Sequence, residues 1–209
     1  MPGVLEIIFV LVVILVSMTI HEATHAYVGN WLGDDTAKQE GRLTLNPIAH
    51  IDPFLTVLLP VLLLLSGGPV FGGAKPVPFN PGRVRYGEFG AMLVGIAGPF
   101  TNLILAFIAF GLYTFFNVGI AGDVLRLAVT VNIGFFVFNM LPIPPLDGSR
   151  LLYFLAPDSV RQVMASLEQY GIIIILAVVL LLGQVLSAYM LGAINFFVTV
   201  FANIFGVVL

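Results

Sequence analysis

Long runs of apolar residues, separated by short polar or Pro- and Gly-rich stretches, dominate the pattern along this chain. A run of about 20 apolar residues can cross the hydrocarbon core of a bilayer as a helix. The last run, residues 171–209, carries no charge. As one helix it would be about 60 Å long, so we divide it near Gly192. The pattern therefore predicts membrane-spanning helices at 4–30, 88–117 and 123–141. It predicts two more in the last run, one before and one after Gly192.

Residues 54–82 break this pattern. The apolar part, 54–66, is only 13 residues long and contains Pro60, and a stretch rich in Gly and Pro follows it. Such a stretch is unsuited to a helix, and extended backbone at membrane depth must pack against protein. We therefore expect 54–82 to form a re-entrant excursion that enters and leaves the bilayer on one side. Residues 159–170 are mildly polar and predict a short interfacial helix.

These elements predict an all-α membrane protein, and its composition agrees. Hydrophobic residues make up 59% of the chain and charged residues only 9%, whereas soluble domains carry about 25% charged residues. We expect a polytopic helical bundle of about five to six spans with a re-entrant extended loop, in a single domain of residues 1–209. Eight Lys and Arg residues and a net charge of −3 exclude nucleic acid as a partner. The lipid bilayer is the expected surrounding.

An H-E-x-x-H motif ends the first predicted span, with His21, Glu22 and His25 as its fixed residues. On a helix the two His side chains lie one turn apart on one face, where both can bind a single Zn²⁺. The Glu can then activate a zinc-bound water as a general base. Three fixed residues also occur by chance, but ionisable groups in an apolar span are costly and usually functional. The context favours one catalytic zinc.

A catalytic zinc needs three protein ligands and one open position. The chain has no Cys, so the third ligand must be His50 or an acid, and the acids near membrane depth are Asp52, Glu88 and Asp147. We choose Asp147 because it follows an apolar run and a Pro-rich break, and Gly148 lets the backbone turn sharply there. The alternative is an ordinary acid in a helix-ending turn. His50 and Asp52 could either support the metal ligands from behind or belong to ordinary loop structure, and we favour loop structure.

Together these residues resemble the site-2 protease family of intramembrane zinc metalloproteases, in its small form without a PDZ or CBS domain. The resemblance covers most of the chain. Its specific parts are the H-E-x-x-H and a distal L-D-G preceded by N-x-x-P-x-P, at residues 139–148. Three further stretches are similar. Residues 98–102 resemble a G-x-x-x-N element of the family, and residues 73–81 resemble its re-entrant loop. Residues 41–53 resemble a stretch seen in small bacterial and archaeal members.

The resemblance implies hydrolysis of a peptide bond within or near a transmembrane helix of a substrate protein. Carried over by position, His21, His25 and Asp147 bind zinc, and Glu22 is the catalytic base. The resemblance also implies substrate-binding roles, for which the candidates are Asn139, Asn102 and Lys75. For the two Asn residues the alternative is ordinary polar contact between helices. An extended segment at 70–79 could pair with an unwound substrate by adding a strand.

The same resemblance fixes a topology, because Asp147 must meet the H-E-x-x-H at one depth. Both motifs end their spans, so spans 4–30 and 123–146 must run in the same direction. Seven cationic residues then share one face, and only Arg126 lies on the other. By the positive-inside rule that face is cytoplasmic, the N-terminus is outside, and the active site lies toward the cytoplasm of a prokaryotic cell. The seven are Lys38, Arg42, Lys75, Arg83, Arg85, Arg150 and Arg161.

Other functions remain open at this point. A divalent-metal transporter could also use intramembrane His and Asp, although it would not need a Glu between two His. The last 39 residues also carry no His and no acidic or basic side chain. A structural membrane protein with a stabilising zinc would need a fourth zinc ligand. A membrane zinc protease with Glu as its third ligand would need that acid in a helical E-x-x-x-D context. The substrate, the trigger and the oligomeric state stay open.

Overall fold

The computed structural model describes residues 4–58 and 74–208, and it confirms the all-α class. Within those residues, four helices are long and apolar enough to span a membrane. They are α1 (Val4–Trp31), α4 (Glu88–Tyr113), α5 (Gly119–Asn139) and α8 (Gly171–Phe205). We expected about five to six spans. The number of spans differs because residues 171–205 form one helix, α8, where we expected two. Residues 59–73 of the expected re-entrant excursion lie outside the described part.

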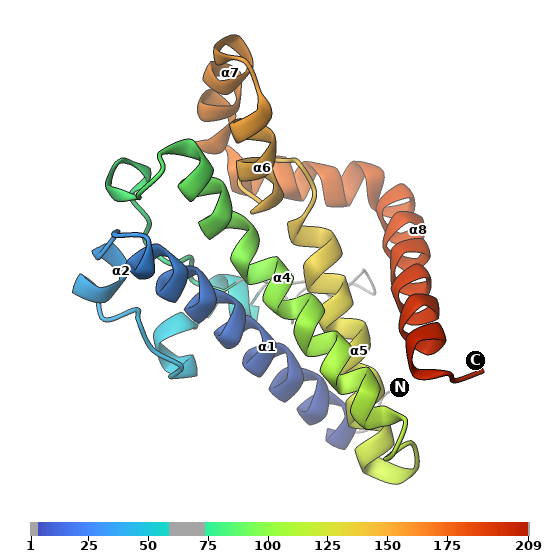
Figure 1. The fold of residues 1–209 in the computed structure, drawn as a ribbon. Helices are drawn as coiled ribbons and strands as arrows, with labels where there is room; N and C mark the ends of the chain where they lie inside the picture. The colour runs from blue at the N-terminus through green and yellow to red at the C-terminus, as the bar shows by residue number, and fades with distance from the viewer. Residues whose placement is uncertain (1–3, 59–73, 209) are drawn as a thin grey trace.

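The helices α1, α4 and α5 form the centre of the molecule, with α4 packed against both of the others (Figure 1). In Figure 1, α1 and α5 run upward and α4 runs downward between them. The first and third spans therefore point the same way, as the topology argument required. A short turn, residues 114–118, joins α4 to α5 at the lower end.

The last apolar run bends at a different place from the one we expected. Its backbone leaves helical geometry at Leu182 (φ −116°, ψ 16°), and α8 continues through Gly192 without a break. Gly183 follows the bend, and Gly is a common cause of kinks. Gly192 is tolerated because apolar surroundings favour keeping every backbone hydrogen bond. In Figure 1 the first part of α8 runs across the top of the bundle and the second part descends beside α5.

The second part of α8 closes the apolar core. Phe201 and Ala202 pack against buried side chains of α4 and α5, among them Phe110 and Ile133. Phe107, Phe201 and Phe205 form ring contacts across this interface.

Shorter elements surround the three central helices. They include α2 (Thr36–Gln39), 3₁₀ turns at Pro47–His50 and Pro81–Arg83, a short π-helix at Pro53–Leu58, α6 (Gly148–Leu155) and α7 (Asp158–Glu168). The helices α6 and α7 lie at the top of Figure 1, whereas residues 47–58 lie lower, beside α1. The predicted interfacial helix at 159–170 corresponds to α7. No pattern in the sequence predicted α6, which begins directly after Asp147.

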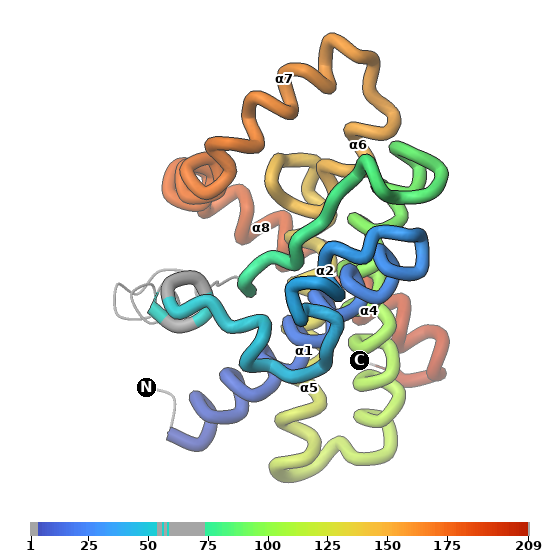
Figure 2. Tube along the Cα trace, turned by 90° about the vertical axis from the view of Figure 1, so that its left-hand side faces the viewer, coloured from blue at the N-terminus to red at the C-terminus, as the bar shows by residue number. Residues whose placement is uncertain are grey.

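Residues 74–80 have no helical structure, as the Pro-rich pattern predicted. This segment passes close to α2 before it leads toward α4 (Figure 2). Its backbone is tied to the preceding loop, because the Lys75 N–H donates to His50 O (2.9 Å) and the Asn80 N–H donates to Asp34 Oδ2 (2.8 Å). The segment is therefore held along the upper end of α1, beside the H-E-x-x-H.

Candidate active site

Two helical turns and one loop bring three metal-ligating side chains together. His21 and His25 come from α1, one turn apart, and Asp147 comes from the loop between α5 and α6. The two Nε2 atoms lie 3.0 Å apart, and Asp147 Oδ2 lies 3.1 Å from His21 Nε2 and 3.4 Å from His25 Nε2. Among the described residues, these three form the one group of His and acidic side chains arranged to hold a metal.

The Nδ1 atom of each imidazole, which faces away from the other two ligand groups, already has a hydrogen-bond partner. His21 Nδ1 lies 2.6 Å from Asn102 Oδ1, and His25 Nδ1 lies 2.7 Å from Val94 O. Both partners are oxygens that can only accept, so we place the proton of each neutral ring on Nδ1. Each Nε2 then directs a lone pair toward the other His and toward Asp147, which is the tautomer that a metal requires.

The donor set fits zinc. Ligand atoms at about 2.0–2.1 Å from a tetrahedral zinc lie roughly 3.3–3.4 Å from one another, close to the separations of the three donor atoms here. Three electron-pair donors facing one another at such distances repel unless a cation lies between them. Two imidazoles and one carboxylate leave a fourth tetrahedral position open, as catalytic zinc sites do.

Gly98 lets α4 approach the two histidines. A Cβ atom at this position would lie 2.3 Å from His25 Nε2 and 2.7 Å from His21 Nε2, distances that no packed side chain allows. The sequence marked Gly98 only as part of a family-like G-x-x-x-N element, whose Asn is the Asn102 that holds His21. The two ends of this element thus serve the same pair of ligands.

A buried chain of amides extends from His21 into the bundle. Asn102 is completely buried on α4, and its Nδ2 donates to Asn132 Oδ1 of α5 (2.9 Å). Asn132 Nδ2 in turn donates to Ser17 Oγ (2.9 Å) and to Ala128 O (2.8 Å). These directional bonds fix which end of the Asn102 amide faces His21. Sequence reasoning missed Asn132 and Ser17, because an isolated Asn or Ser in an apolar run carries no pattern.

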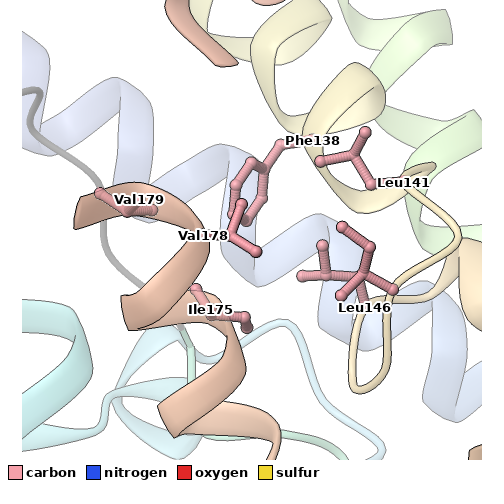
Figure 3. Close-up of a pocket in the computed structure, with 7 residues that line it drawn as sticks. Phe138, Leu141, Leu146, Ile175, Val178 and Val179 are labelled. Atoms are coloured by element: carbon pink, nitrogen blue, oxygen red, sulfur yellow. The ribbon is translucent and has the colours of Figure 1, made fainter. Parts of the chain in front are cut away.

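Packing of the neighbouring Leu146 places Asp147. Leu146 is buried and lines a small apolar pocket with Phe138 of α5 and with Ile175 and Val178 of α8 (Figure 3). Immediately after the Asp, Gly148 passes so close to the end of α5 that a Cβ there would lie 2.4 Å from Met140 O. The loop therefore reaches the histidines for two reasons. The Leu146 side chain is anchored in apolar surroundings, and Gly148 has no side chain to keep the loop away from the end of α5.

Glu22 lies outside the ligand triad, on the wall of the same cleft. The cleft has a volume of about 330 Å³, and Glu22, His25 and Asp147 line it together with residues 76–79 and Arg150. Glu22 Oε2 accepts a hydrogen bond from the backbone N–H of Val77 (3.0 Å). A carboxylate and two of the three candidate zinc ligands thus share one cavity.

Comparison with known proteins identifies the family. The model of peptidase family M50 matches residues 117–183, which include α5 and the Asp147 loop. A relative from Bacillus subtilis (strain 168), named "Putative zinc metalloprotease YwhC", is 42% identical over 179 residues, covering 80% of this chain and 78% of the relative. The chain belongs to peptidase family M50.

Further relatives of this M50 chain carry similar names. Two proteins named "Putative zinc metalloprotease Rip2" match it, at 32% identity over 91% of the chain and 73% of the relative in Mycolicibacterium smegmatis, and at 31% over 90% and 72% in Mycobacterium tuberculosis (strain H37Rv). No solved structure matches the chain. The family and the apolar helices confirm an integral membrane zinc metalloprotease, rather than the metal transporter kept as an alternative.

The three predicted substrate-binding residues of this M50 chain lie in different surroundings. Asn102 contacts His21 and has no exposed surface. Asn139 is partly buried at the end of α5 and donates to Phe135 O of its own helix (3.0 Å). Lys75 is exposed in the extended segment. His50, a rejected ligand candidate, is buried away from the triad and bonds through Nε2 to Thr44 O (2.9 Å).

Proposed function

We propose that this M50 protease hydrolyses a peptide bond within or near a transmembrane helix of a membrane-protein substrate, with Glu22 as its general base. One observation carries the proposal: Glu22, His25 and Asp147 line a single cleft at the end of an apolar helix, and His21 converges with His25 and Asp147. A zinc site at that place suits a substrate that lies in the bilayer, because His21 and His25 belong to an apolar helix long enough to cross it and Asp147 follows another such helix.

The residues that would hold zinc are His21, His25 and Asp147. When bound, zinc acts as a Lewis acid that polarises a carbonyl and makes water more acidic. Glu22 takes one proton from the attacking water as the new C–O bond forms. It then passes that proton to the leaving amine nitrogen as the C–N bond breaks, so Glu22 ends the cycle ionised as it began.

Asn102 supports this chemistry through His21. Its oxygen holds the imidazole in the tautomer with a free Nε2, so we assign Asn102 to ligand orientation rather than to direct contact with substrate. Asn139 and Lys75 remain candidates for substrate contact. Lys75 lies in the segment that lines the approach to the cleft, and Asn139 would have to leave its bond to Phe135 O.

The substrate must unwind before it is cut, because a helix buries its carbonyls in i→i−4 hydrogen bonds. An extended stretch of substrate can pair with an exposed strand by β-addition. Residues 74–80 are extended, and residues 76–79 border the cleft. They would provide such a strand beside Glu22.

We further propose that the upper end of the bundle in Figure 1 faces the cytoplasm. The loops and short helices there hold seven of the eight cationic residues, and Arg126 lies near the other end, in the early turns of α5. The positive-inside rule then places the N-terminus outside, and water reaches the cleft from the cytoplasmic side.

The proposal is tested with a Glu22→Gln variant and a reporter protein that carries one transmembrane helix. Loss of a general base lowers rates by about 10²–10⁴-fold, so we expect cleavage of the reporter to fall by that factor while zinc content stays at the wild-type level. The wild-type protein, with and without a zinc chelator, is the control. A Glu22→Gln protein that cleaves the reporter at the wild-type rate refutes the proposed base.

A further inference from the structure

The contact between Val77 and Glu22 joins a flexible catalytic side chain to the backbone of the extended segment. The Val77 N–H donates to Glu22 Oε2 at 3.0 Å, so one of the two carboxylate oxygens is committed to this bond. A Glu side chain has three rotatable bonds and loses much rotamer freedom when it is fixed. A hydrogen bond to the charged carboxylate is a strong way to fix it.

The segment that supplies this N–H is itself anchored on both sides of Val77. Before it, Arg42 Nη2 donates to Lys75 O (2.5 Å), and beyond it the Asn80 N–H donates to Asp34 Oδ2 (2.8 Å). Arg42 is only 5% exposed and Asp34 only 2%. Both anchors are charged side chains buried against the segment, which is costly unless their hydrogen bonds are made.

The spacing of prolines makes Val77 the only possible donor at the centre of the segment. Pro76 and Pro78 have no backbone N–H. Between Lys75 and Phe79, the backbone can therefore donate only from Val77, and Glu22 already accepts that hydrogen bond. A substrate strand beside residues 76–78 would meet carbonyl groups alone.

We propose that residues 74–80 are a positioning element for the catalytic base: the Val77 N–H holds Oε2 of Glu22, and Arg42 and Asp34 hold the segment in place. The inference rests on the proposed role of Glu22 and adds to it. The segment acts on the rate of the chemical step, because it orients the group that takes the proton. Its central N–H takes no part in binding the substrate.

The test removes this N–H and keeps the rest of the segment. Val77→Pro deletes the donor in a stretch that already alternates with proline, and Val77→Ala deletes the side chain while keeping the N–H. Hydrogen bonds to charged groups correspond to about a 10- to 100-fold effect. We expect kcat of V77P to fall by that factor below kcat of V77A, with equal KM and equal zinc content.

A second replacement keeps the test decisive if V77P does not fold. Substituting the α-hydroxy acid of valine at position 77 changes the amide into an ester, which removes the donor without adding a ring. We expect the ester protein to show the same loss in kcat, with zinc content and thermal unfolding matching the wild type.

The outcomes separate this inference from the proposed function. Equal kcat for the ester protein and the wild type overturns the positioning role, as does a rise in KM with kcat unchanged, which would assign the N–H to substrate binding. If Glu22→Gln is fully active, the base itself is misassigned and both proposals fail. If Glu22→Gln is inactive and the ester protein is not impaired, only the positioning role fails.

Discussion

The metal side and the base side of the cleft are built by different means. On the metal side, His21 and His25 stand on one helix, and each is fixed through Nδ1 by a group of α4 that is buried in the bundle. On the base side, Glu22 shares that helix, but its described support comes from one backbone N–H of an irregular segment. Packed helices hold the proposed zinc ligands, whereas a loop holds the proposed base.

This difference has a functional consequence. Groups fixed by packed helices give a metal site with little freedom, as high affinity requires. A segment outside the helices can be altered without disturbing the ligands. Metal affinity and catalytic rate should therefore respond to different substitutions. The predictions below test the metal side, and the substitutions at Glu22 and Val77 described above test the base side.

The largest effect is expected for Gly98→Ala. The added Cβ would lie 2.3 Å from His25 Nε2, so α4 and the His pair cannot both keep their positions. We expect zinc affinity to fall more than about 100-fold, above the range seen for lost outer partners of metal ligands, as measured by competition with a chromogenic chelator. Gly134→Ala on α5 is the matched control, because its Cβ would meet only Met190 Cε at 3.9 Å. Unchanged zinc affinity in G98A would contradict the close approach of α4.

A smaller effect is expected for Asn102→Ala. His21 then loses the oxygen that holds its Nδ1–H, and Asn132 loses the donor to its own oxygen. Loss of such a partner typically lowers metal affinity by about 10- to 100-fold, and we expect a change in this range in the same chelator assay. Asn102→Asp keeps an acceptor for His21 and should recover part of the affinity. Equal zinc affinities for N102A and N102D would show that the contact with His21 is unimportant.

Much of the metal side could be predicted from the sequence, because its signals are local. The H-E-x-x-H places two ligands one turn apart on any helix, and an acid after a Pro-rich break in a protein with few charges stands out. Asp147 still required the topology argument, which the parallel course of α1 and α5 satisfies.

The supporting contacts could not be predicted, because they join residues far apart in the chain. Asn132 reaches Ser17 across 115 positions, and Val77 reaches Glu22 across 55. Neither pair follows a helical or strand period. The position of the bend at Leu182 could not be predicted for another reason. Residues 171–209 are apolar throughout, and several glycines there could each have marked the bend.

His21, His25 and Asp147 together are the proposed zinc ligands of this M50 protease. The sharpest test is the zinc content of purified Asp147→Ala protein beside that of the wild type, at matched protein concentration and after dialysis against a weak chelator. We expect about one zinc per wild-type chain, as a site with one metal requires, and almost none in the variant. Full zinc content in D147A would contradict the three-ligand site.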